Sequence, residues 1–170
     1  SRMPTRIDYP YALAVGDVDG DGDLDLVFGN GYHGIGSFAQ SRLYLNDGTG
    51  TFSDVTATRM PVVFADTRSV ALGDVDRDGD LDLVLVNNSS QSLLYLNDGT
   101  GTFSDATSTR MPVTFYAKTS VAFGDVDADS DLDLVFGSSA QNPLYVNDGT
   151  GTFSDATAAR MPVDVDRTTA

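Results

Sequence analysis

The chain contains no cysteine and a single histidine, His33. Without cysteine there is no disulfide, no thiolate catalysis and no cysteine-ligated zinc site. One histidine excludes a multi-histidine metal centre and leaves the usual nucleophile–base sets incomplete. These absences predict a protein that is not an enzyme.

Glutamate is also absent, so all 25 acidic residues are aspartates, against 10 basic residues and a formal net charge of −15. Ordinary surface acidity mixes the two acids, so these aspartates are expected to occupy defined positions. Such a charge repels phosphate backbones and attracts cations. We therefore expect no nucleic-acid partner.

Long apolar runs are missing too. No stretch approaches the roughly 18 apolar residues of a membrane helix, so no membrane insertion is expected. The N-terminus lacks a basic region followed by an apolar run, so we expect any export signal to have been removed or to lie outside this sequence. The 41% hydrophobic content of the 170 residues still suffices for a packed core.

The tripeptide Arg-Met-Pro occurs four times, at spacings of 57, 51 and 50 residues, starting at Arg2, Arg59, Arg110 and Arg160. Each interval contains an Asp-rich loop, an apolar run and the segment Asn-Asp-Gly-Thr-Gly-Thr-Phe-Ser-Asp. Such self-similarity indicates a repeat architecture. The expected units are residues 1–57, with a long loop between the second and third strands, 58–108 and 109–158, followed by 159–170, the start of the next linker or a C-terminal tail.

The second unit shows the strand pattern. Residues 70–72 lead into its Asp-rich loop, and the nearly continuous apolar run 81–86 leaves it, as in a strand covered on both faces. Residues 94–96 and 102–107 are two more strands around a glycine-rich turn. No window has sustained helical periodicity, so no helix is expected.

Four antiparallel strands in about 50 residues are typical of a propeller blade. We predict an all-β fold, with three four-stranded antiparallel blades per chain. A solenoid of hairpins is the alternative, and a sandwich is disfavoured because it seldom has a fixed period with nearly identical turns.

Propellers have about 4–8 blades, so three blades cannot close a ring. The chain is then either part of a longer array or one of several identical chains that complete a ring. An open array would expose two broad apolar faces. We therefore expect self-association, with a homodimer of six blades favoured.

Five aspartates fall within nine residues in each unit, and we call these segments the Asp loops (residues 17–25, 74–82 and 125–133). Carboxylates this close destabilise a fold without a counter-ion. Oxygen donors alone argue against zinc or copper and favour calcium, with magnesium second. An acidic, solvated loop without metal is the remaining alternative. The candidate metal ligands are Asp17, Asp19, Asp21, Asp23, Asp25, Asp74, Asp76, Asp78, Asp80, Asp82, Asp125, Asp127, Asp129, Asp131 and Asp133.

The spacing suggests a role for each loop position. Counted from the first aspartate, positions one, three and five are expected to turn their carboxylates inward, and the sixth residue reverses the chain. The seventh offers its backbone carbonyl and points its side chain toward solvent. The ninth completes the set of ligands around the ion. Gly22 and Gly79 suit the reversal, and Ser130 fits it less well. An EF-hand is excluded because its position 12 needs a bidentate Glu and helices should flank the loop; here position 12 is Phe28, Leu85 or Phe136.

The segments Gly16 to Gly29 and Leu43 to Phe52 closely resemble the FG-GAP/VCBS repeat, and the resemblance extends over residues 1–163. Such repeats build the propellers of integrin α subunits, of several fungal and bacterial lectins and of secreted bacterial surface proteins. The Gly-Ala-Pro element of the integrin version is missing, since Asn30 follows Gly29. This favours the VCBS-like bacterial type.

The resemblance implies one calcium ion in each loop between the first and second strands, and so three per chain. We expect the calcium to be mainly structural, since an ion bound only by the native state stabilises it. Extracellular calcium fills even weak sites of about 10⁻⁴–10⁻³ M. The expected location is therefore secreted, extracellular or at the cell surface.

The first unit carries about six extra residues within segment 30–40, which joins its second and third strands and should lie opposite the Asp loops. The inter-blade linkers are expected to open on the same face and to bring nearby Arg59, Phe64, Arg110, Phe115, Tyr116 and Lys118. Aromatic faces beside polar donors suit a sugar ring. Alternatives are a self-packed loop and, for the arginines, inter-blade packing. The candidate ligand-binding residues are Tyr32, His33, Phe38, Arg59, Arg110 and Tyr116.

The sequence thus predicts a calcium-binding β-propeller module for ligand recognition, with lectin-like carbohydrate binding favoured. The alternative is a structural or protein–protein adhesion module of a secreted or surface protein, in which calcium is purely structural. Catalysis by paired carboxylates would need groups that the metal occupies, and only His33 or Lys118 could act as a strong base. The expected partners are calcium, a glycan and a second copy of the chain.

Overall fold

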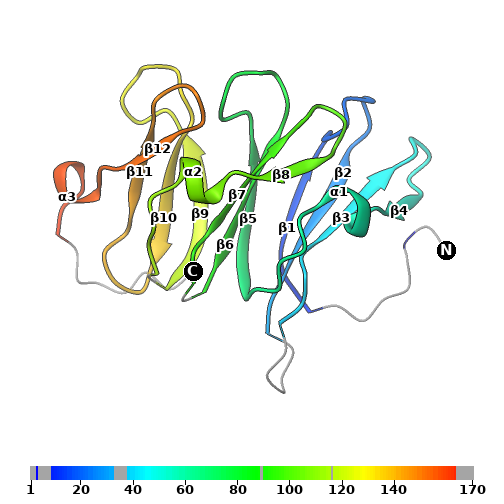
Figure 1. Cartoon of the computed structure of the whole chain (residues 1–170), viewed down its shortest axis with the longest axis horizontal. Helices are drawn as coiled ribbons and strands as arrows, with labels where there is room; N and C mark the ends of the chain where they lie inside the picture. Colours follow the sequence, from blue (N-terminus) through cyan, green and yellow to red (C-terminus); the bar gives the residue numbers. More distant parts are fainter. Residues whose placement is uncertain (1–2, 4–8, 33–37, 89, 116, 164–170) are drawn as a thin grey trace.

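The computed structural model describes residue 3 and residues 9–32, 38–88, 90–115 and 117–163. It contains three four-stranded antiparallel sheets, each with its strands in chain order (Figure 1). The all-β architecture of three blades is therefore confirmed. The strands are β1 (Pro10–Gly16), β2 (Asp25–Asn30), β3 (Arg42–Asn46) and β4 (Phe52–Asp54) in the first blade, β5 (Thr67–Gly73), β6 (Asp82–Asn87), β7 (Leu93–Asn97) and β8 (Phe103–Asp105) in the second, and β9 (Lys118–Gly124), β10 (Asp133–Ser138), β11 (Leu144–Asn147) and β12 (Phe153–Asp155) in the third.

The strand register puts every Asp loop at the same edge of its blade. In the first blade Gly16 pairs with Asp25, so the Asp loop is the connection of the β1–β2 hairpin. Gly73 pairs with Asp82, and Gly124 with Asp133, in the same way. The turns between the third and fourth strands return to this edge, which is the upper one in Figure 1.

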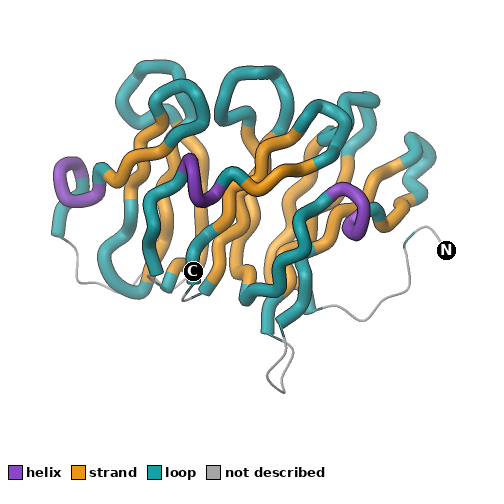
Figure 2. Tube along the Cα trace, viewed as in Figure 1, coloured by secondary structure: helices purple, strands orange, loops and turns teal. Residues whose placement is uncertain are grey.

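The blades stack face to face, with the innermost strands β1, β5 and β9 side by side (Figure 2). One apolar core lies between the first two blades and includes Val27 and Leu83. A second lies between the last two and includes Val84 and Leu134. Alternate residues of β6 thus enter different cores, and all six of its residues are buried. This explains the nearly continuous apolar run there.

Each blade ends in one helical turn, so the prediction of no helix is wrong, as is the extension of the fourth strand to residue 107. In the second blade the Asp105 carboxylate accepts a hydrogen bond from Thr107 N at 2.9 Å, and Thr107 Oγ1 accepts one from Leu94 N at 3.0 Å. These bonds turn the chain away from the sheet. The helices α1 (Thr56–Arg59), α2 (Thr107–Arg110) and α3 (Thr157–Arg160) are too short to show periodicity. In the described ranges, no helix has the length and apolar character needed to cross a membrane.

Candidate metal-binding loops

The ninth aspartate of each loop is buried and holds the loop in place through hydrogen bonds to its carboxylate. Asp82 is fully buried. Its Oδ2 accepts a hydrogen bond from Val75 N at 3.0 Å, and its Oδ1 accepts one from Asn97 N at 2.9 Å. Asp25 and Asp133 have the same two kinds of partner. Burial raises the pKa of Asp82 to about 6 even though both hydrogen bonds favour its charged form.

The first aspartate organises the backbone of the loop. Asp17 accepts hydrogen bonds from Gly20 N and Gly22 N, both at 2.9 Å, through its two different oxygens. Asp74 and Asp125 bind the sixth-position amides of their own loops in the same way. These bonds hold the carboxylate inside the loop.

The sixth position reverses the chain in a left-handed conformation in all three loops. Its φ is 92° at Gly22, 96° at Gly79 and 74° at Ser130. Only glycine adopts this region without steric strain, so Ser130 is strained. The fourth position is also left-handed, with φ of 63° at Arg77 and 66° at Ala128, which the sequence analysis did not anticipate.

Each loop gathers one cluster of three carboxylates, with one oxygen from each within 4.8 Å of the others. All three loops could therefore hold a metal ion, one per blade. The clusters are Asp17, Asp19 and Asp25 in the first blade, Asp74, Asp76 and Asp78 in the second, and Asp125, Asp127 and Asp133 in the third.

Several cluster oxygens are buried with no hydrogen-bond partner among the described residues. They are Asp19 Oδ1, Asp74 Oδ1 and Asp76 Oδ1. Burial is the main cause that raises the pKa of Asp19 and Asp76, and repulsion from the neighbouring fifth-position aspartate adds to it. An unpartnered buried carboxylate oxygen is unfavourable, and a bound cation would compensate it. The oxygen-only donor set and these oxygens fit a hard divalent cation.

The fifth aspartates contribute unevenly. Their Oδ1 atoms accept hydrogen bonds from the seventh-position amides, at 2.9 Å for Asp21, 3.0 Å for Asp78 and 2.9 Å for Asp129. Of the three, only Asp78 belongs to a cluster. The other two lie in the loop without joining the group of close oxygens.

The seventh aspartates do not point to solvent, so that expectation is wrong. A Cβ at Gly99 would lie 2.6 Å from Asp80 Oδ2, and one at Gly149 would lie 2.7 Å from Asp131 Oδ2. The side chain therefore packs under the glycine-rich turn of its own blade. Asp131 also forms an ion pair with Arg77 of the preceding blade.

Arg59 and Arg110 lie at the Asp-loop edge, so the expectation that they lie beside segment 30–40 is wrong. Arg59 Nη1 donates a hydrogen bond to the Thr100 carbonyl in the turn of the next blade. Arg110 Nη1 donates in the same way to the Thr150 carbonyl, and it lies 3.5 Å from Asp76 Oδ2. These contacts match the inter-blade alternative, because each arginine joins its own blade to the glycine-rich turn of the following blade.

At the opposite edge, Tyr32 and Phe38 lie together. They form an isolated β-bridge, and their rings are edge to face with centroids 5.9 Å apart. Both side chains remain nearly half exposed. His33 and Tyr116, the other two non-arginine candidates, lie outside the described residues.

Lys118 is not an accessible base, although the sequence placed it near the ligand. It is fully buried, and its Nζ donates a hydrogen bond to Thr114 Oγ1 at 3.0 Å. Burial lowers the pKa of this amine.

Sequence reasoning missed the asparagine that opens each glycine-rich turn. Asn97 Nδ2 donates to the Val18 carbonyl of the preceding blade at 2.7 Å, and Asn147 Nδ2 donates to the Val75 carbonyl at the same distance. The signal was available, because the asparagine occurs at the same place in all three units.

Comparison with known proteins agrees with this repeat geometry. A family model described as an FG-GAP-like repeat matches residues 17–85 and residues 74–136. Both matches begin at the first aspartate of an Asp loop. No curated protein matches the chain.

Proposed function

The chain belongs to the family of FG-GAP-like repeat proteins, and we propose that it is a calcium-binding propeller module for ligand recognition, with one calcium ion in each Asp loop. The observation that carries the metal assignment is the recurrence, in three blades, of one carboxylate cluster at the same edge. Buried oxygens without partners in the first two loops support it.

Calcium suits these loops better than other cations. The donors of the clusters are carboxylate oxygens, which hard cations prefer to imidazole or thiolate ligands. Calcium accepts 6–8 oxygens in irregular geometry, whereas magnesium requires a stricter octahedron. We propose the three carboxylates of each cluster as the first ligands, with the fifth and seventh aspartates supplying further oxygens.

Calcium removal tests this assignment. Titration calorimetry should show three calcium ions per chain, and magnesium should bind more weakly. At about 100-fold saturation each site adds about 2.7 kcal/mol, and each kcal/mol raises the melting temperature by about 2–4 °C. For three sites the lost stabilisation is about 8 kcal/mol, so EGTA should lower the melting temperature by about 16–32 °C. An unchanged melting temperature, or no heat of calcium binding, would contradict the proposal.

A location outside the cell is consistent with weak calcium sites, since sites of about 10⁻⁴–10⁻³ M fill at extracellular calcium levels. The absence of a Gly-Ala-Pro element after Gly29 and Gly137 favours the VCBS-like bacterial type. We infer a secreted or cell-surface protein that binds rather than catalyses.

Carbohydrate is the ligand that we favour. Tyr32 and Phe38 present half-exposed aromatic rings at the edge opposite the Asp loops, and aromatic faces suit the apolar side of a sugar ring. The mutual packing of these rings equally fits the second candidate, a structural or adhesion module with purely structural calcium.

A glycan array in calcium buffer separates the two candidates. Competable binding to defined sugars that a Tyr32→Ala, Phe38→Ala double variant loses would support carbohydrate recognition. Val113→Ala, which changes an exposed side chain in a linker, is the control. No binding to any glycan by a calcium-loaded chain would favour the structural or adhesion module.

A further inference from the structure

The first blade exposes an apolar face that its neighbours bury. Leu13, Val15 and Leu24 are 52%, 52% and 58% exposed. Their counterparts in the second blade, Val70, Leu72 and Leu81, pack against the core shared with the first blade. We call the exposed face of the first blade, defined by Leu13, Val15 and Leu24, the leading face.

The third blade exposes the complementary face. Val126 is 46% exposed, whereas its counterparts Val18 and Val75 are each 1% exposed in the two internal junctions. Val135 and Met161 lie on the same side, at positions that correspond to two members of the first core, Val27 and Met60. We call the face defined by Val126, Val135 and Met161 the trailing face.

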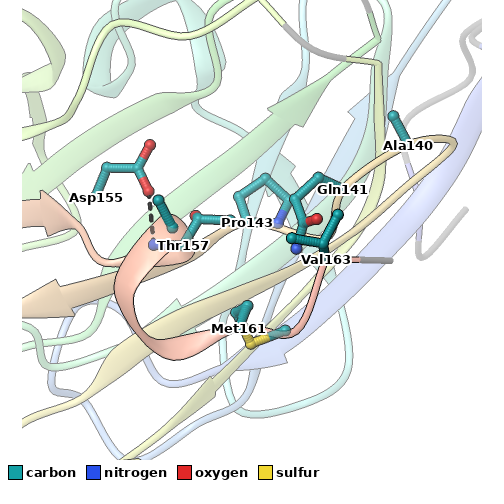
Figure 3. A pocket seen from close by; sticks show the side chains of 8 residues that line it. Ala140, Gln141, Pro143, Asp155, Thr157, Met161 and Val163 are labelled. Atoms are coloured by element: carbon teal, nitrogen blue, oxygen red, sulfur yellow. Dashed lines mark hydrogen bonds between the residues drawn. The ribbon is translucent and has the colours of Figure 1, made fainter. Parts of the chain in front are cut away.

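An open cavity of about 470 Å³ lies next to Met161, one of the three residues that define the trailing face (Figure 3). It is lined by Gln141, Pro143, Met161 and Val163, among others. Between the first two blades, the space lined by the equivalent residues Gln40 and Met60 is only about 10 Å³.

The difference in volume has a simple cause. One side of the small space is lined by Gln40 and Met60. The same repeat positions in the third blade, Gln141 and Met161, line the large cavity. The other side of the small space is closed by Leu85, Leu93 and Tyr95 of the following blade. The following blade therefore fills the space beside Met60, whereas the space beside Met161 is open.

Each of the two exposed faces also carries one half of the polar contacts that the internal junctions form. In each internal junction an asparagine amide donates to a valine carbonyl, and an arginine donates to a threonine carbonyl. At the trailing face Val126 and Arg160 occupy the corresponding positions, and Arg160 Nη1 donates a hydrogen bond to Asp127 Oδ2 at 2.8 Å. Asn46 and Thr49 occupy the matching positions in the first blade.

We propose that the occupant of the trailing face is the leading face of a second copy of this chain. The junction would repeat an interface that the chain already forms twice. Asn46 of one copy would donate to the Val126 carbonyl of the other, and Arg160 would donate to the Thr49 carbonyl.

Two copies are the number that closes a ring. The contact joins two different surfaces, so it propagates from chain to chain until rotation closes it. Rings of blades contain about 4–8 members, and six is the multiple of three in that range. Both apolar faces are then buried at two identical junctions.

Light scattering on the calcium-loaded chain tests the proposal. The expected molar mass is twice the 18.0 kDa of one chain. Leu13→Asp and Val126→Asp should each weaken the dimer at least about 100-fold, because a buried unpaired charge costs about 3–5 kcal/mol. Val113→Asp, at a 71% exposed linker residue, is the matched control and should leave the dimer intact.

Mixing the two variants distinguishes the orientation. Each variant alone should be a monomer, and circular dichroism should show that both fold. In the mixture one junction keeps two unaltered faces, so a dimer should reappear. A wild-type monomer, a ladder of larger species, or a Val126→Asp chain that dimerises like the wild type would each overturn the proposal, the last by indicating pairing of two leading faces.

Discussion

Asn97 in the second blade donates a hydrogen bond from Nδ2 to the backbone carbonyl of Val18 in the first blade, at 2.7 Å and across 79 positions of the chain. The Oδ1 of the same side chain accepts Gly101 N at 3.1 Å. One amide thus orders its own turn and ties that turn to the preceding Asp loop. Packing between blades and the shape of the candidate metal loop therefore depend on the same residue.

Replacing this amide should weaken the junction. Asn97→Ala leaves the Val18 carbonyl without its partner, and an unsatisfied buried carbonyl costs about 1–3 kcal/mol. Asn46→Ala is the control, because Asn46 makes the turn contact without a cross-blade bond. Both variants are made in the Leu13→Asp chain, which is expected to be a monomer, so that dimer formation does not affect the result. Chemical denaturation should show the lower free energy of unfolding of Asn97→Ala. Equal losses for the two variants would assign the effect to the turn alone.

Removal of one candidate ligand should empty one loop. Asp76→Asn should lower the calcium stoichiometry from three ions to two and reduce the rise in melting temperature on calcium addition by about a third. Calorimetry and thermal melts measure both. Asp105→Asn makes the same charge change outside the loops and should leave three sites. A stoichiometry of three for Asp76→Asn would remove Asp76 from the ligand set.

Ser130 adopts a left-handed conformation, with φ of 74°. Ser130→Gly should relieve this strain and stabilise the chain by about 1 kcal/mol, since the backbone bond from Ser130 N to Asp125 is kept. Gly22→Ser makes the reverse change at φ of 92° and should destabilise by about the same amount. Denaturant unfolding measures both, and a destabilising Ser130→Gly would show that the hydroxyl is needed.

Lys118 should make stability depend on alkaline pH. Burial lowers the pKa of its amine in the folded chain, while the nearby Asp155 opposes the shift. The penalty for burying the ammonium is complete below the lowered pKa, shrinks as the pH rises, and vanishes above the unfolded value of 10.5. Lys118→Met should therefore melt at a higher temperature than the wild type at pH 7, and the difference should narrow toward pH 10.5. A difference that stays constant with pH would indicate packing as its cause.

Thr107 should be essential for the end of the second blade. Its Oγ1 accepts the Leu94 amide at 3.0 Å in a buried site. Thr107→Val keeps the shape of the side chain but leaves the Leu94 amide without an acceptor, which should lower the free energy of unfolding by about 1–3 kcal/mol. Thr109→Val removes a hydroxyl that bonds a backbone carbonyl from an exposed position, and it should cost less. Similar losses for both variants would argue against the buried contact.

The strand framework could be predicted because it depends on local pattern. The recurring Arg-Met-Pro tripeptide defines the period, and the apolar run 81–86 marks a strand buried on both faces. The loop reversal at Gly22 and Gly79 also follows from residue type. These features need no knowledge of the neighbouring blade.

The features that escaped prediction arise from contacts between distant segments. Arg59 was assigned to the wrong edge, because only the blade packing reveals that its partner is the Thr100 carbonyl. The seventh aspartate looked solvent-facing until the turn of its own blade was seen to cover it. The helical turn ending at Arg110 is set by the hydrogen bond between Thr107 and Leu94, which no periodicity records.

Because the Asp loops and the glycine-rich turns share one edge, the negative charge of the molecule is concentrated at that edge. These segments hold 18 of the 25 aspartates of a chain whose formal charge is −15. Each bound divalent ion would cancel two of those charges at that edge. Calcium-loaded protein should therefore leave an anion-exchange resin at lower salt than metal-free protein, so the loading state could be followed chromatographically without any label.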